Sequence, residues 1–109
     1  MSLPLLRGTL DILVLKALSW GPKHGFEIIT WLEDRSRGHL AVNDGALFQA
    51  LQRMEERKLI AAEWVMTENS RRARYYSLTS AGRAHLRTES GRVTKYAEAL
   101  VSILGARSA

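Results

Sequence analysis

The chain has no cysteine among its 109 residues. Disulfide bonds and zinc sites built on cysteine thiolates are therefore excluded, while the redox compartment stays open. No uninterrupted apolar run of roughly 18 residues occurs, so the sequence offers no membrane-spanning helix. The apolar N-terminal stretch carries Arg7, Asp11 and Lys16 and has no charged segment ahead of it. This pattern argues against a signal peptide and favours a cytoplasmic location.

Acidic residues are fewer than basic ones, 11 against 16, which gives a net charge of +5 and a pI of about 10.1. This balance favours an anionic partner, with nucleic acid ahead of a membrane surface. A basic protein that is merely soluble explains the charge equally well. The placement of the basic residues therefore has to decide between these interpretations.

Residue groups typical of catalysis or metal binding are missing. His24, His39 and His85 do not have the spacing of metal ligands. Glu55 and Glu56 are adjacent and point to different faces of a predicted helix, so they do not form a catalytic pair. No serine is placed beside a histidine base. We therefore expect neither an enzyme nor a cofactor.

Hydrophobic periodicity and turn signals predict mostly helical structure with one β-hairpin. In chain order, helices are expected over 9–19, 22–35 and 44–58, strands over 60–67 and 72–78, and a last helix over 80–104. Thr9, Asn43 or Asp44, and Thr79 are the expected N-caps of the first, third and last helices. Phe26, Ile29 and Leu32 are expected on the core face of the second helix.

Three helices followed by a basic two-stranded hairpin describe a winged helix-turn-helix. We expect residues 1–79 to form this DNA-binding domain and residues 80–109 to form a C-terminal dimerisation helix, in one compact unit. The last helix would be roughly 37 Å long, too long to pack only on the small core before it.

The segment from 71 to 83, RRARYYSLTSAGR, carries four arginines and no acid. Strand alternation places Arg72, Arg74 and Tyr76 on one face of the hairpin. Arginines along a strand suit the phosphate backbone of a nucleic acid. A hairpin edge that is only solvated is the alternative.

The third helix directs Leu47, Leu51 and Met54 to the core, which leaves polar side chains on its other face. Gln49, Gln52 and Arg53 belong to residue types that form bidentate contacts with base edges. An ordinary solvated face is the alternative, and Arg53 could hold either a base or a phosphate. Lys23 and His24, at the start of the second helix, would lie near the DNA backbone.

Two helices carry apolar surface that a single small core does not bury. The first is apolar nearly all round, which predicts burial on two sides. In the last, apolar or small residues recur at a spacing of seven, which predicts a short coiled-coil-like seam weakened by Ser90 and Gly91. We expect a homodimer whose contacts come from Leu6, Leu10, Leu13, Leu86, Val93, Ala97, Leu100 and Leu104.

Four ordered segments, GTLDILVLKALSWGPKHGFEI, NDGALFQALQRMEERKLI, NSRRARYYSLT and TSAGRAHL, resemble the PadR family of bacterial transcriptional regulators in its small form. The resemblance implies a homodimeric repressor that binds double-stranded DNA, with dimer contacts from the first and last helices. Two recognition helices on a two-fold axis would then predict an inverted-repeat operator. Phe48 stands where the family usually has tyrosine, and Lys58 where it usually has glycine. The first change removes a hydroxyl that could bond a phosphate, and the second requires a strained or different helix end.

With the resemblance, the expected DNA-binding residues form one set. They are Lys23, His24, Asn43, Asp44, Phe48, Gln49, Gln52, Arg53, Arg71, Arg72 and Arg74. Small members of the family bind flat effectors between subunits, so Trp31, which falls off the expected core face, is a candidate contact for a small aromatic effector. A winged-helix module that binds protein or RNA is the alternative function.

Overall fold

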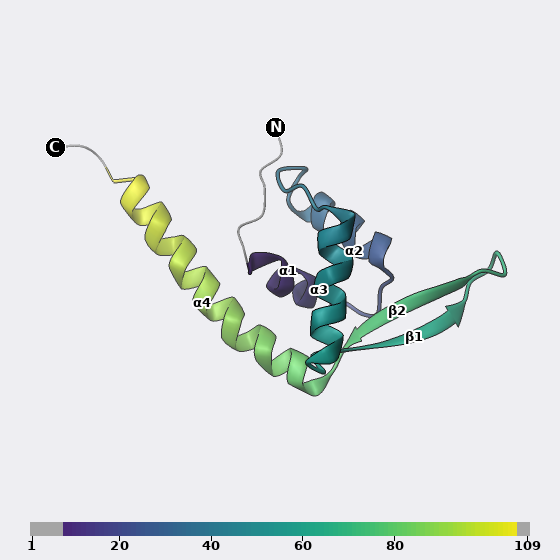
Figure 1. The fold of residues 1–109 in the computed structure, drawn as a ribbon. Helices are drawn as coiled ribbons and strands as arrows, with labels where there is room; N and C mark the ends of the chain where they lie inside the picture. Colours follow the sequence, from purple (N-terminus) through teal and green to yellow (C-terminus); the bar gives the residue numbers. More distant parts are fainter. Residues whose placement is uncertain (1–7, 107–109) are drawn as a thin grey trace.

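The computed structural model describes residues 8–106. It contains, in chain order, α1 (Thr9–Leu18), α2 (Gly25–Arg35), α3 (Asp44–Glu56), β1 (Ile60–Met66), β2 (Arg72–Leu78) and α4 (Ser80–Leu104) (Figure 1). Three helices pack together, the β1–β2 hairpin projects from them on one side, and α4 runs away on the other. This is the predicted winged helix-turn-helix with a long last helix.

The expected cap of α1 and the expected start of α2 were wrong. Gly8, with a left-handed φ of 86°, precedes α1, and no side chain caps that helix. α2 begins at Gly25 rather than near Pro22, because Lys23 pairs with Tyr76 of β2 in an isolated antiparallel bridge. Long-range strand pairing therefore holds the segment that local sequence assigned to a helix.

Side-chain caps were predicted correctly for the helices that follow. Asn43 Oδ1 accepts a hydrogen bond from the Ala46 N–H at 3.0 Å, so it is Asn43 that caps α3. Thr79 Oγ1 accepts from the Gly82 N–H at 3.0 Å and fixes the start of α4. Both caps satisfy donors that the first helical turn leaves without partners.

The core lies between α1, α2, α3 and the base of the hairpin. Its buried side chains include Leu15, Ile28, Leu51 and Ile60. Phe26, expected in this core, is instead 63 % exposed, and Gly25, Ile28, Ile29 and Leu32 form the buried face of α2. A three-residue spacing drifts by about 60° per step around a helix of 3.6 residues per turn, which carries Phe26 off the face shared by Ile29 and Leu32.

Two glycines permit close approach between elements. A side chain at Gly25 would meet the Phe48 ring of α3 at 2.7 Å. One at Gly82 would clash with the main-chain carbonyl of Leu59. These glycines let α2 pack on α3 and the start of α4 pack on the β1 side of the core.

The departure at Lys58 has a structural outcome. Lys58 adopts a left-handed φ of 62°, as the glycine usual at this position would. The N–H groups of Leu59 and Lys58 donate to the carbonyls of Met54 and Glu55 at 2.9 and 3.0 Å. This is a Schellman ending, so Lys58 bears backbone strain and α3 still ends as a glycine-capped helix would.

Only the first part of α4 packs on the core. Gly82 is buried, and Leu86 packs against the core cluster. From residue 91 to residue 106 every residue is exposed. Along the described part of the chain, no helix is both long and apolar enough to cross a membrane.

Candidate nucleic-acid interface

The outer face of α3 presents polar side chains beside a buried inner face. Leu47, Ala50, Leu51 and Met54 point into the core, whereas Gln49 and Gln52 are exposed. Neither glutamine side chain has a hydrogen-bond partner within residues 8–106. Their amides are therefore available to an external partner.

Arg53, also expected on this face, lies at its edge. Its Nη2 donates to Asp11 Oδ1 of α1 at 3.0 Å, and the Arg53 side chain remains 56 % exposed. The guanidinium is already engaged by a carboxylate. A contact with DNA would use its remaining N–H groups or replace Asp11.

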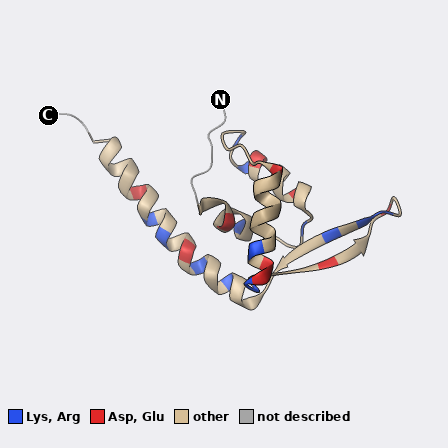
Figure 2. Ribbon diagram, in the orientation of Figure 1, with Lys and Arg blue, Asp and Glu red and all other residues tan. Residues whose placement is uncertain are grey.

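The wing carries three arginines in different surroundings. Arg74 Nη2 donates to Glu55 Oε2 of α3 at 2.7 Å, which ties the wing to α3. Arg71 and Arg72 are exposed and have no carboxylate within ion-pair distance in the described part of the chain. Figure 2 shows basic residues along β2 and into its turn, whereas the charged residue of β1 is an acid, Glu63. The free positive charge of the wing therefore lies toward its tip.

Tyr76 lies at the base of the wing, on the face of β2 that carries Arg74. Burial raises the pKa of the Tyr76 phenol, and the neighbouring Arg74 guanidinium opposes that shift. Tyr76 therefore belongs to the core rather than to the exposed basic surface.

The segment before α2 joins the wing to the helices. Lys23 exchanges two main-chain hydrogen bonds with Tyr76, with N···O distances of 3.1 and 2.9 Å. His24 Nδ1 accepts from the Glu27 N–H at 3.3 Å, and Glu27 Oε1 accepts from the His24 N–H at 3.1 Å. This capping box fixes the His24 ring at the N-terminus of α2, where its edge meets Tyr75.

A cleft of about 540 Å³ separates the wing from the starts of α2 and α3. Phe26 and Phe48 line it from the helices, and Arg71 and Arg72 line it from the wing together with Trp64. Phe48 thus faces the wing, although it lacks the hydroxyl that a tyrosine would offer. The cleft brings together residues of α2, α3, β1 and β2 that lie up to 52 positions apart in the sequence, from His24 to Tyr76.

Two of the expected DNA-binding residues, Asn43 and Asp44, lie at the N-terminus of α3. The Asn43 amide oxygen is occupied as the cap, and Asp44 is an exposed acid in the first turn. A carboxylate repels phosphate. Among the expected DNA-binding residues, Asp44 is therefore the one whose charge most disfavours contact with the DNA backbone.

Three residues that the sequence did not single out contact the expected DNA-binding arginines. Asp11 and Glu55 hold two of the expected DNA-binding arginines, and Trp64 lies beneath Arg72 and Arg74. The Trp64–Arg74 pairing follows from the hairpin register, which strand alternation could have revealed. The pairing of Asp11 with Arg53 across 42 positions has no sequence signal.

The expected dimerisation residues divide into two groups. Leu10, Leu13 and Leu86 are half-buried against the core, whereas Val93, Ala97, Leu100 and Leu104 are exposed on α4. Leu6 lies outside the described residues. Across residues 8–106, no group of three or more His, Asp or Glu side chains could hold a metal ion.

Comparison with known proteins decides the family. Residues 14–88, well over half of the chain, match the Transcriptional regulator PadR-like family. The chain belongs to the PadR family. The family consists of transcriptional regulators rather than enzymes, and its winged helix is a DNA-binding fold.

Solved structures share the fold of this PadR-family chain. A PadR-like regulator of Bacillus cereus superposes with a TM-score of 0.80 at 22 % identity, over 94 % of this chain and 97 % of that one. A PadR family regulator of Eggerthella lenta gives a TM-score of 0.75 at 27 % identity, over 93 % and 86 %. An uncharacterised protein of Lysinibacillus sphaericus is 28 % identical over 82 residues, 75 % of either chain.

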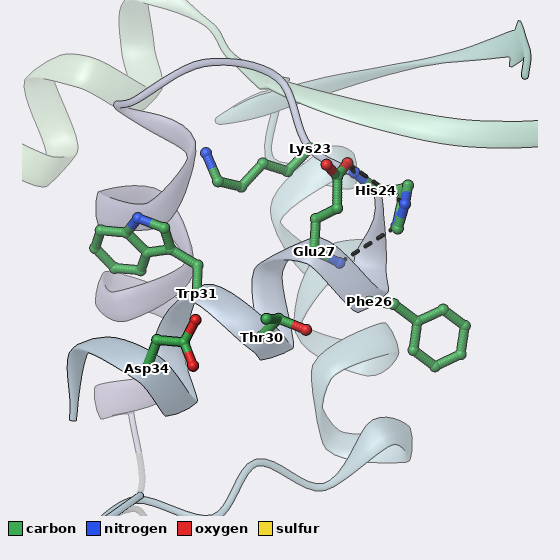
Figure 3. A pocket seen from close by; sticks show the side chains of 7 residues that line it. All are labelled: Lys23, His24, Phe26, Glu27, Thr30, Trp31 and Asp34. Carbon is green, nitrogen blue, oxygen red and sulfur yellow. Dashed lines mark hydrogen bonds and ion pairs between the residues drawn. The ribbon is translucent and has the colours of Figure 1, made fainter. Parts of the chain in front are cut away.

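Trp31, the candidate effector contact, lines an open pocket of about 340 Å³ on the outer side of α2 (Figure 3). The pocket is formed by Lys23, His24, Phe26, Glu27, Thr30, Trp31 and Asp34. None of these residues belongs to α4. The Trp31 ring also lies 5.1 Å from the Arg35 guanidinium and packs partly on the core.

Proposed function

We propose that this PadR-family chain is a homodimeric repressor that binds an inverted repeat in double-stranded DNA. The observation that carries the proposal is the presence of two exposed surfaces without carboxylate partners, one on α3 and one on the wing. They are the outer face of α3 around Gln49 and Gln52 and the part of the wing that carries Arg71 and Arg72. Phe48 of α3 lines one cleft together with both wing arginines.

In this proposal α3 enters the major groove and the wing follows the adjacent backbone. Gln49 and Gln52 offer amides that can read base edges, because an amide donates and accepts toward one base at once. Arg71, Arg72 and Lys23 carry the phosphate contacts. Arg53 and Arg74 contribute only as far as DNA competes with Asp11 and Glu55 for their guanidinium groups.

The dimer is supported by the outer half of α4. Tyr96, Leu100, Val101, Ile103 and Leu104 are all exposed, and Leu104 is 83 % exposed. Apolar side chains in such number on one helix mark an interaction surface. A groove lined by Thr9, Val93, Tyr96 and Leu100 runs between α1 and α4, so a second copy would meet both helices.

A two-fold dimer would place two copies of α3 about one helical turn, or about 34 Å, apart along DNA, which predicts an inverted repeat. In this proposal the dimer represses transcription by occupying a promoter. A regulator of this kind works on the chromosome, and in a bacterium this places it in the cytoplasm.

The test is fluorescence anisotropy with the promoter region upstream of the protein's own gene. Binding with a Kd between nanomolar and micromolar, and a steep fall in affinity as salt rises, supports the proposal. Unlabelled RNA and random DNA serve as competitors. Preference for RNA, or no binding to either nucleic acid, would favour the winged-helix interaction module instead.

Release by a small aromatic effector is a second part of the proposal, and the pocket beside Trp31 supports it. A ring could stack on the indole while Lys23 or His24 meets a polar substituent. A variant with Trp20→Phe and Trp64→Phe retains only Trp31 as a tryptophan. Quenching of its emission by planar aromatic compounds is expected, and no response across such a panel would remove this part.

A further inference from the structure

The wing holds an exposed tryptophan under two arginines. The guanidinium carbons of Arg72 and Arg74 lie 4.7 and 5.6 Å from the centroid of the Trp64 ring, which is itself 55 % exposed. In the hairpin register Trp64 is directly opposite Arg74, and Met66 is opposite Arg72. Arg72 is therefore the diagonal neighbour of Trp64, within reach of a long side chain on the same face.

The two arginines differ in what else they touch. Arg74 is held by the Glu55 carboxylate of α3 at 2.7 Å, and both side chains are 36 % exposed. Arg72 contacts the indole and has no carboxylate within ion-pair distance across residues 8–106. One guanidinium is thus neutralised at the base of the wing, and the other keeps its charge near the tip.

We infer that Trp64 is a positioning residue that holds Arg72 for a phosphate contact, while Arg74 fastens the wing to α3 through Glu55. The inference rests on the proposed DNA-binding function and assigns different roles to two arginines of one strand face. An arginine side chain has many rotamers, and restricting them before binding reduces the entropy lost when DNA is bound. The flat indole supplies that restriction and leaves the N–H groups of Arg72 at the ring's edge free to donate.

A double-mutant cycle tests the link between Trp64 and Arg72. Affinity for a short random-sequence duplex is measured over a salt series for the wild type, Trp64→Leu, Arg72→Ala and the double variant. Trp64→Leu should weaken binding roughly two- to fivefold with an unchanged salt slope, because the charge of Arg72 remains. Arg72→Ala should lower the magnitude of the slope by about one, and adding Trp64→Leu to it should change nothing further.

Two further variants separate positioning from loss of structure. Trp64→Phe keeps an aromatic face and should retain most of the affinity. Val65→Ala truncates an exposed side chain on the opposite face of β1 and should bind like the wild type. Additive losses in the double variant, or a Trp64→Leu protein that binds like the wild type, would overturn the role of Trp64.

The role of Arg74 has its own test. The pair Glu55→Gln and Arg74→Gln removes both charges together and leaves the net charge unchanged. An anchoring role predicts the wild-type salt slope with a lower melting temperature, whereas a phosphate contact predicts a slope reduced by about one. If the wild type binds no DNA under any salt condition, the proposed function fails and this inference fails with it. If the wild type binds DNA and the cycle is additive, only the inference fails.

Discussion

The wing and the outer half of α4 both project from the helical core, in different directions, and they expose different chemistry (Figure 1). The wing presents Arg71 and Arg72, and its large exposed ring, Trp64, lies against guanidinium groups. The outer half of α4 presents apolar side chains such as Leu100 and Leu104. Its charged residues are of both signs (Figure 2).

This difference indicates two kinds of partner. Free positive charge on a narrow hairpin suits a polyanion, whose binding weakens with salt. Apolar side chains along a helix suit another apolar helix, because their burial is favourable at any salt concentration. One short chain therefore separates self-association from DNA contact on two projections, and variants in each should fail in distinguishable ways.

The largest effect is expected from Leu100→Asp on α4. Truncation of a leucine in a packed seam costs about 2–5 kcal/mol, and an unpaired buried carboxylate costs more, so the dimer dissociation constant should rise by roughly 30-fold or more. Sedimentation velocity measures the change. Thr88→Asp, an acid at an exposed polar position of the same helix, is the control. An intact dimer of Leu100→Asp would remove this seam from the account.

A smaller and sequence-dependent loss is expected from Gln52→Ala on the outer face of α3. If Gln52 reads a base, operator binding should weaken by about 1–3 kcal/mol while random-DNA binding stays unchanged. Arg53→Ala should behave in the same way only if Arg53 leaves Asp11 for a guanine. Anisotropy with operator and random duplexes distinguishes these cases, and equal losses on both DNAs would assign the residue to the backbone.

Arg72→Ala on the wing should instead weaken all DNA sequences alike. The magnitude of the salt slope should fall by about one, since one phosphate contact is lost. Arg87→Ala removes the same charge from an exposed position of α4 and is the matched control. Wild-type behaviour of both variants would make the wing a solvated edge.

The smallest effect is expected from Asp11→Asn, which breaks the ion pair with Arg53. The Arg53 side chain is 56 % exposed and that of Asp11 24 %, so solvent screens the pair in part and its loss should lower the free energy of unfolding by only about 0.2–1 kcal/mol. Chemical denaturation measures this difference. Operator binding should stay equal or become tighter, because Arg53 is released; a clear loss of affinity would show that Asp11 positions Arg53 for DNA.

Strand alternation, turn residues and helix caps in the sequence predicted β2 and the start of α4 correctly. Alternation and a polar turn gave β2 as Arg72–Leu78, and the Thr79 cap gave the start of α4. The start of α2 was missed because Pro22 is locally compatible with a first helical turn, whereas the pairing of Lys23 with Tyr76 is a contact across 53 positions. Phe26 was misplaced because the prediction took a three-residue spacing for one helix face, whereas Gly25, Ile28, Ile29 and Leu32 form the buried face of α2.

At the site, residue types were predictable and their partners were not. The glutamines of α3 and the wing arginines were expected from helix phase and strand alternation. Gln49, Gln52, Arg71 and Arg72 lie exposed, whereas Arg74 is half-buried. The carboxylates of Asp11 and Glu55, which occupy Arg53 and Arg74, come from other elements. Only the packed fold brings these charges together, so sequence alone overstated the number of free arginines.

The most direct test of the account is a footprint on the protein's own promoter, combined with the stoichiometry of the complex measured by mass. A protected inverted repeat with two chains bound, and half-site centres about one helical turn apart, is the predicted result. A monomer protecting one unrepeated half-site would contradict the account, as would promoter DNA that shows no protection at low salt.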